Sequence, residues 1–83
     1  MKVNVRYFAS IREAIGLGSE SIDTQAQTVL ALREELLSRG GAYAQALAPG
    51  RAVRTALDQV LCEAGAELRE GCELAFFPPV TGG

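Results

Sequence analysis

The 83-residue sequence has no histidine, no tryptophan and only two cysteines. Without histidine, the chain lacks the commonest metal ligand and the commonest general base. Cys62 and Cys72 do not form a CxxC pair, and two thiols are too few for a disulfide framework, a zinc site or an iron–sulfur cluster. We expect two small buried hydrophobic side chains in a reducing compartment, and no bound metal or cofactor.

The sequence also has no large excess of positive or negative charge and no long apolar segment. Eight basic residues against ten acidic ones give a net charge of −2, and no two basic residues are adjacent. A nucleic-acid binder carries a basic stripe, so that class is not expected. No segment approaches the roughly 18 apolar residues of a membrane helix, and polar residues interrupt the N-terminus where a signal peptide would be apolar. The sequence therefore predicts a cytoplasmic protein with no nucleic-acid or membrane partner.

The composition favours one packed domain over residues 1–83. Hydrophobic residues make up 48% of the chain and charged residues 22%, which suits a globular core better than a disordered chain. A chain of this length has room for only one domain.

The first third of the chain predicts two strands around a short helix. Residues 2–8 alternate, with three apolar side chains on one face and Phe8 on the polar face. Ser10 and Glu13 have the spacing of a capping box, which predicts a helix over 12–15 that ends at Gly16. A second strand is expected over 19–24, with Ile22 inward. The inward residues of the first strand are Val3, Val5 and Tyr7.

The middle of the chain predicts the main helix. Thr28 is a favourable N-cap, and Val29, Leu32 and Leu36 follow with helical spacing. Gly40-Gly41 should end this helix, and one or two further helical turns are expected over 42–48. The side chains predicted for its solvent face are Arg33, Glu34, Glu35 and Arg39.

The rest of the chain predicts strands over 52–58, 60–62 and 72–77. Leu74 and Phe76 should point inward in the last strand, which Pro78 ends because proline cannot donate to a ladder. Strands in both halves around one long helix indicate an α+β fold, a mixed sheet with that helix on one face. The other face is left for solvent or a partner.

The C-terminus is the most informative segment, because it ends in Gly82-Gly83 after Pro78-Pro79. The prolines hold residues 78–83 off the body as a tail, and glycines leave the backbone free to thread a narrow channel. A terminal carboxylate, with a pKa of about 3.3–3.7, is ionised and a poor electrophile, so it needs activation. The chain has no P-loop, so an ATP-using partner must supply that chemistry.

These features resemble the family of small subunits of molybdopterin synthase, ubiquitin-like sulfur carriers. The similarity spans essentially the whole chain, and the ending is its most specific part. The resemblance implies a β-grasp fold with about five strands. The matching stretches are residues 5–13 with Gly16, residues 28–32 and residues 71–83.

The resemblance also implies a mechanism in which this chain is not itself an enzyme. An adenylyltransferase related to ubiquitin-activating enzymes would adenylate Gly83 with ATP, and a sulfur donor would convert the adenylate to a thiocarboxylate. The carrier would then insert its tail into the large synthase subunit, within a heterotetramer. There the sulfur would pass to a cyclic pyranopterin precursor, and the catalytic residues would belong to the large subunit.

Three other interpretations also fit the sequence. A sulfur carrier of the thiamine pathway and a modifier that conjugates to lysines share the fold and the Gly-Gly end. A plain interaction domain with an incidental glycine end is the third. The Phe-Phe-Pro-Pro-Val-Thr-Gly-Gly ending favours the molybdopterin branch.

A partner surface is expected beside the tail. Phe8 and Phe77 are apolar residues on otherwise polar strand faces, and the β-grasp resemblance places their strands side by side. Clustered exposed aromatic side chains are typical of interfaces. Leu61 on the short edge strand would extend this patch. The other residues expected at the interface are Pro78, Pro79, Val80 and Thr81. Gly82 belongs with Gly83 to the expected carrier site, where it gives the tail access to the partner.

Overall fold

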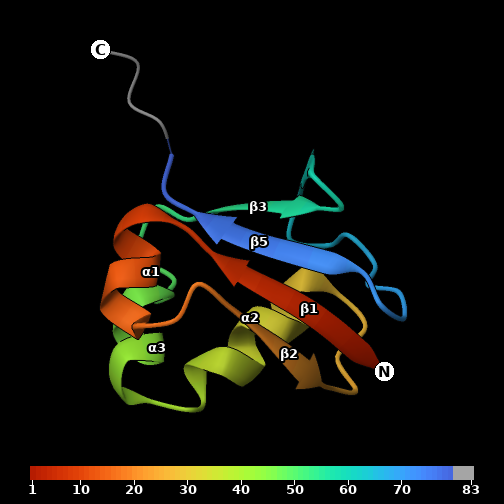
Figure 1. Ribbon diagram of the computed structural model, residues 1–83, viewed down its shortest axis with the longest axis horizontal. Helices are drawn as coiled ribbons and strands as arrows, with labels where there is room; N and C mark the ends of the chain where they lie inside the picture. The colour runs from red at the N-terminus through yellow and green to blue at the C-terminus, as the bar shows by residue number, and fades with distance from the viewer. Residues whose placement is uncertain (80–83) are drawn as a thin grey trace.

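The computed structural model describes residues 1–79 (Figure 1). This part of the chain contains five strands and three helices in the order β1, α1, β2, α2, α3, β3, β4, β5. The strands are β1 (Lys2–Tyr7), β2 (Ser19–Asp23), β3 (Arg54–Leu57), β4 (Val60–Cys62) and β5 (Glu73–Phe77). The helices are α1 (Ala9–Ile15), α2 (Val29–Leu37) and α3 (Gly41–Ala46).

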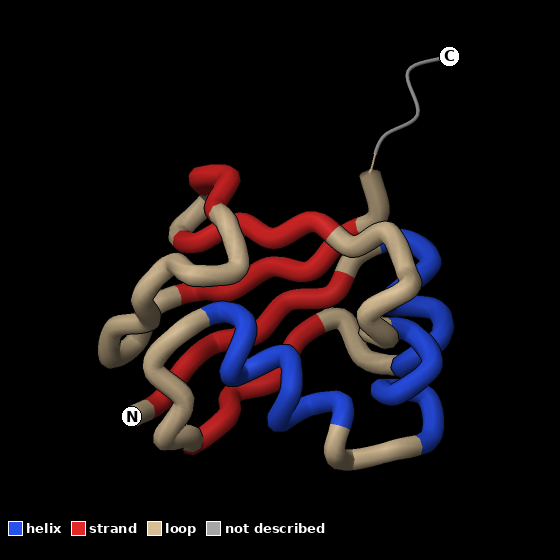
Figure 2. Tube along the Cα trace, turned by 180° about the vertical axis from the view of Figure 1, so that it is seen from behind, coloured by secondary structure: helices blue, strands red, loops and turns tan. Residues whose placement is uncertain are grey.

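The strands form one mixed sheet in the order β2-β1-β5-β3-β4. The central strand β5 is parallel to β1, with Val5 opposite Leu74, and all other neighbouring strands are antiparallel. Helix α2 crosses one face of the sheet, and α1 and α3 pack together at the end where β5 leaves it (Figures 1 and 2). The predicted five-stranded sheet with one main helix on one face is confirmed.

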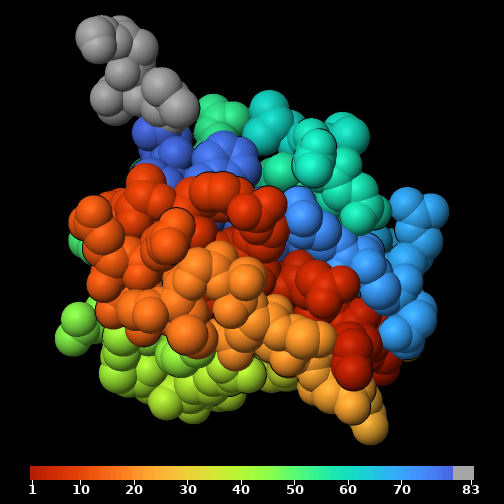
Figure 3. Space-filling view, viewed as in Figure 1, coloured from red at the N-terminus to blue at the C-terminus, as the bar shows by residue number. Residues whose placement is uncertain are grey.

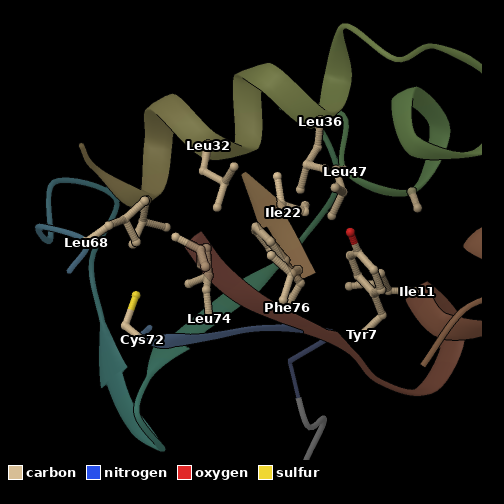
Figure 4. Close-up of a cluster of buried hydrophobic side chains, with 14 residues drawn as sticks. Tyr7, Ile11, Ile22, Leu32, Leu36, Leu47, Leu68, Cys72, Leu74 and Phe76 are labelled. Atoms are coloured by element: carbon tan, nitrogen blue, oxygen red, sulfur yellow. The ribbon is translucent and has the colours of Figure 1, made fainter. Parts of the chain in front are cut away.

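The core lies between the sheet and α2 (Figure 4). The alternation predicted for β1 is confirmed, because every second residue of this strand is buried. In β5 the two expected inward residues, Leu74 and Phe76, are buried, and Ala75 between them is buried as well. Tyr7 stacks on Phe76 with ring centroids 6.1 Å apart. The largest fully buried side chains are Tyr7, Phe76, Leu32, Leu36, Leu47, Leu74, Val3, Val5 and Val29.

The predicted capping box at Ser10 is wrong. Helix α1 begins at Ala9 with Phe8 as its N-cap, and no side chain caps it. The Phe8 carbonyl accepts the amides of Ile11 and Arg12 at 3.1 and 3.2 Å. The earlier start brings Ile11 into the core, where it is 5% exposed. Burial of this isoleucine therefore outweighs the local capping preference, while the predicted stop at Gly16 is confirmed by its left-handed φ of 88°.

Helix α2 begins as predicted, with the Thr28 hydroxyl accepting the Ala31 amide at 3.1 Å. Its three expected core residues are buried. It ends earlier than expected, with Ser38 rather than a glycine as C-cap. Gly40 and Gly41, with φ of 72° and 55°, instead make the turn into α3.

The predicted solvent face of α2 is wrong at two positions. Arg33 is half-buried, and its Nε and Nη2 donate to the carbonyls of Leu47 and Ala48, both at 2.8 Å. Glu35 is also half-buried and accepts a 2.6 Å hydrogen bond from the buried Thr24 hydroxyl. Both side chains bind α2 to segments that are distant in the sequence, so the local sequence pattern could not predict these contacts.

Candidate functional site

The described part of the chain ends two residues after β5, where the backbone leaves the sheet. Phe8 donates its amide to the Phe76 carbonyl at 3.1 Å, which joins the end of β1 to the end of β5. Pro78 and Pro79 follow, are half-buried and line a pocket of about 490 Å³ with Ser10, Arg51 and other residues. The predicted tail residues Val80, Thr81, Gly82 and Gly83 lie outside the described residues.

Phe8 and Phe77 line one shallow pocket of about 420 Å³ on the uncovered face of the sheet. Phe8 is 37% exposed, and Phe77 is half-buried. Figure 3 shows this face, with β1 in red and β5 in blue meeting near the point where the chain leaves the sheet. The structure thus brings the two predicted aromatic residues together. The remaining lining residues are Arg6, Ala56, Gln59, Glu73 and Ala75.

Two alanines with small side chains leave the space for this pocket. Ala56 on β3 and Ala75 on β5 are directly opposite each other, and both are buried on the face that α2 does not cover. Their small side chains form the floor between the larger residues at the rim. Sequence reasoning missed Ala56, Ala75 and Gln59. Only the register of β3 against β5 could have found the alanine pair.

Arg6 forms the polar rim of the pocket. Its guanidinium carbon lies 5.0 Å from the centroid of the Phe8 ring, within cation–π range. Its Nη1 lies 3.9 Å from Glu73 Oε1, as a partly exposed ion pair. An apolar centre with a charged rim is the usual anatomy of a protein–protein interface.

Leu61 is exposed but lies outside this pocket. It is 63% exposed and opposite Ala56 in the β3–β4 register. However, it lines a different pocket, of about 270 Å³, with Leu30, Arg33 and Cys62 among others. The structure therefore does not bring Leu61 into the hollow between Phe8 and Phe77.

The two cysteines are both free thiols, but their environments differ. Cys72 is 6% exposed and belongs to the core, as expected. Cys62 is only half-buried, and its Sγ donates to the Thr55 hydroxyl at 3.5 Å. Over residues 1–79, no group of three or more His, Cys, Asp or Glu side chains is placed to hold a metal ion.

A cluster of hydrogen bonds around the Glu20 carboxylate holds α3 against the sheet. Glu20 on β2 accepts hydrogen bonds from the hydroxyls of Tyr7 and Tyr43 at 2.8 and 2.7 Å, and from Arg39 at 3.0 Å. Burial alone would raise the pKa of Glu20, but the bonds from Tyr43, Arg39 and Tyr7 outweigh it and lower that pKa. Burial and the bond to Glu20 raise the pKa of Tyr7 far above its ordinary value. This cluster is structural, since each polar group in it has a partner.

In the part of the chain that the structure describes, no helix is long and apolar enough to cross a membrane. The Phe8–Phe77 pocket contains one guanidinium, one carboxylate and one amide, but no thiol or hydroxyl nucleophile among its described lining residues. This surface is suited to docking.

A mixed sheet with parallel first and last strands at its centre and one helix across its face defines a β-grasp, ubiquitin-like protein. One chain of the complex of subunits 1 and 2 of the molybdopterin-converting factor from Helicobacter pylori has this fold. Its matching chain superposes with a TM-score of 0.71 at 27% identity, covering 100% of both chains.

The chain belongs to the ThiS family, whose model matches residues 5–83. The molybdopterin synthase sulfur carrier subunit of Haemophilus influenzae is 40% identical over 81 residues, covering 98% of this chain and 99% of the relative. The Escherichia coli protein of the same name is 37% identical with the same coverage. The family resemblance predicted from the sequence is confirmed.

Proposed function

We propose that this chain is the sulfur carrier subunit of a molybdopterin synthase and carries sulfur on the carboxyl carbon of Gly83. The observation that supports this most directly is the 40% identity to a named sulfur carrier subunit over nearly the full length of both chains. The chain would be the non-catalytic member of a complex, and its large partner subunit would supply the catalytic residues.

The carrier chemistry takes place at one carbon atom. An adenylyltransferase related to ubiquitin-activating enzymes joins the Gly83 carboxylate to the AMP part of ATP and releases pyrophosphate. A sulfur donor then delivers sulfur to that carbonyl carbon, and AMP leaves to give the thiocarboxylate. ATP is consumed by the partner, so this chain needs no bound cofactor of its own.

The described surface supports a docking role for the tail end of the sheet. The pocket between Phe8 and Phe77 is on the uncovered face and next to the strand end from which the tail departs. An apolar pocket there would seat the large subunit while residues 78–83 enter its active site. Two carriers and two large subunits would form the heterotetramer, and the sulfur would pass to the cyclic pyranopterin precursor.

Mass spectrometry tests the carrier step. The purified chain is incubated with its adenylyltransferase, ATP and a sulfur donor, and the gain of one sulfur for one oxygen at the C-terminus is measured. Deletion of Gly83 should abolish both pyrophosphate release and the mass shift without changing the circular dichroism spectrum. Replacing Gly82 by valine should impair both, because a side chain narrows the path of the tail.

The second half of the test uses the large subunit. Thiocarboxylated carrier mixed with it should convert the pyranopterin precursor to molybdopterin. Full activation of the Gly83 deletion would contradict the carrier mechanism. Thiocarboxylate formation without molybdopterin synthesis would instead assign the chain to another sulfur pathway.

A further inference from the structure

Helix α2 has a second side-chain stripe besides the one that faces the core. Leu30, Arg33, Glu34 and Leu37 are spaced i, i+3, i+4 and i+7, which places them on one face of the helix. Leu30 is 47% exposed, and Leu37 is half-buried. Two leucines seven residues apart with residues at i+3 and i+4 between them have the spacing of a helix-pairing seam.

This stripe borders a groove beside α2. Helix α2 lies on the face of the sheet (Figure 2) opposite the one that carries the Phe8–Phe77 pocket. The groove has a volume of about 600 Å³. Leu30 and Arg33 also line the neighbouring pocket that reaches Leu61 at the β4 edge, so the apolar surface continues beyond the helix. The groove is lined by Leu30, Arg33, Glu34, Leu37, Ser38 and Pro49.

The stripe is complementary to itself under twofold symmetry. An axis perpendicular to α2 between residues 33 and 34 brings a second α2 alongside in the antiparallel direction. Leu30 of each copy then faces Leu37 of the other, and Arg33 of each copy faces Glu34 of the other. A twofold dimer requires a patch of this kind, in which one surface matches itself.

The charged groups at the centre of the stripe are available for such pairing. The exposed Glu34 carboxylate makes no hydrogen bond or ion pair within residues 1–79. Arg33 uses Nε and Nη2 for the carbonyls of Leu47 and Ala48, and its Nη1 has no partner among residues 1–79. Those two bonds hold the guanidinium in place, so little side-chain freedom is lost when a carboxylate pairs with it.

We propose that a second copy of this chain occupies the α2 groove, as an antiparallel pair of α2 helices with Leu30–Leu37 and Arg33–Glu34 contacts across a twofold axis. The nine-residue helix limits the contact area, so the dimer is weak and depends on protein concentration. The Phe8–Phe77 pocket lies on the opposite side of the sheet, so the pairing leaves it free (Figures 1 and 2). The proposal does not depend on the sulfur carrier function.

Analytical ultracentrifugation of the full chain tests the pairing, from about 10 µM to about 1 mM, the range expected for a weak interface. The sedimentation coefficient should rise with concentration toward that of a dimer. Leu30→Ser should raise the dissociation constant tenfold or more, because it removes a central apolar anchor. Glu34→Lys should have a similar effect, because it opposes two cations.

Leu17→Ser is the matched control, since Leu17 is another exposed leucine, 42% accessible, in the loop before β2. It should leave the dissociation constant unchanged. Circular dichroism should show the same fold for all three variants, because none of the three side chains is buried. A wild-type chain that stays monomeric at about 1 mM would overturn the proposal. A dimer that Leu30→Ser and Glu34→Lys do not weaken would overturn it as well.

Discussion

The hydroxyl of Tyr43 donates a 2.7 Å hydrogen bond to Oε2 of Glu20, which joins α3 to β2. The same oxygen accepts the hydroxyl of Tyr7 at 2.8 Å, and Oε1 accepts Arg39 at 3.0 Å. Tyr7 is only 1% exposed, so its hydroxyl depends on this carboxylate. One side chain therefore holds a helix, a central strand and an edge strand together.

Removing that carboxylate should destabilise the fold. Glu20→Ala leaves the buried Tyr7 hydroxyl unpaired, which should lower the free energy of unfolding by about 2–3 kcal/mol. Urea unfolding followed by circular dichroism measures the loss. Glu13→Ala, at an exposed position of α1, should change stability by less than about 0.5 kcal/mol. Equal effects of the two substitutions would contradict the structural role of Glu20.

The same cluster predicts a pH dependence. The hydrogen bonds lower the pKa of folded Glu20 below its ordinary value of 4.5, so the unfolded chain binds the proton more readily. The stabilising contribution is present above pH 4.5 and is lost as the pH falls through the lowered pKa. The stability gap between the wild type and Glu20→Gln should therefore narrow from neutral pH to about pH 3. A gap that stays constant would show that the charge of Glu20 does not contribute.

The pocket on the uncovered face should be a binding surface rather than part of the core. Phe8→Ala and Phe77→Ala should each weaken binding to the large subunit by about 2 kcal/mol or more, because both rings line the same exposed pocket. Calorimetric titration of the two subunits measures this loss.

Stability measurements provide the control for these two variants. Phe76→Ala, in the fully buried neighbour on the other face, should lower the free energy of unfolding by about 3–5 kcal/mol. Phe8→Ala and Phe77→Ala should remain well below that. A loss of about 3–5 kcal/mol in either would identify its ring as a core residue.

The strands were predictable from the sequence because a half-buried strand repeats every two residues. Val3, Val5 and Tyr7 show that period, as do Leu74 and Phe76, and all five are buried. The face of Phe8 followed from the same alternation. That Phe8 lies near Phe77 could be predicted only from the β-grasp resemblance, because the pairing of β1 with β5 leaves no pattern in the local sequence.

The features that were missed all depend on contacts between distant segments. The hollow formed by Ala56 and Ala75 depends on the register of β3 against β5. The Tyr43–Glu20 bond depends on where α3 packs, and the start of α1 depends on burial of Ile11. A local motif such as the Ser10 capping box cannot account for such contacts.

The two cysteines should be dispensable for sulfur loading. The double variant Cys62→Ser, Cys72→Ser should still form the thiocarboxylate, because the sulfur is proposed to reside on the Gly83 carboxyl carbon. Cys72→Ser should lower the free energy of unfolding by about 1–3 kcal/mol, since it places a hydroxyl in the core. Cys62→Ser should have a smaller effect, because Cys62 is half-buried and next to the Thr55 hydroxyl. Failure of a folded double variant to load sulfur would show that a thiol takes part.

The β3–β4 hairpin contains a correctable local strain. Its two turn residues, Asp58 and Gln59, have φ of 48° and 70°, as in a type I′ turn that favours glycine at the second position. Gln59→Gly should stabilise the fold by about 0.5 kcal/mol, because relief of the left-handed strain exceeds the added chain entropy. Thermal unfolding measures this gain. Asp58→Gly should instead destabilise, because Asp58 Oδ1 accepts the Glu73 amide at 3.0 Å.

The place of β5 in the sheet has a consequence for damaged chains. β5 is the only described strand that links the β1–β2 pair to the β3–β4 pair. A chain truncated before Glu73 would be left with two separate hairpins, and isolated hairpins are marginally stable at best in water. Such a chain should not fold, and so should not compete with the intact protein for the large subunit. Proteolytic loss of the last strand should therefore unfold the molecule.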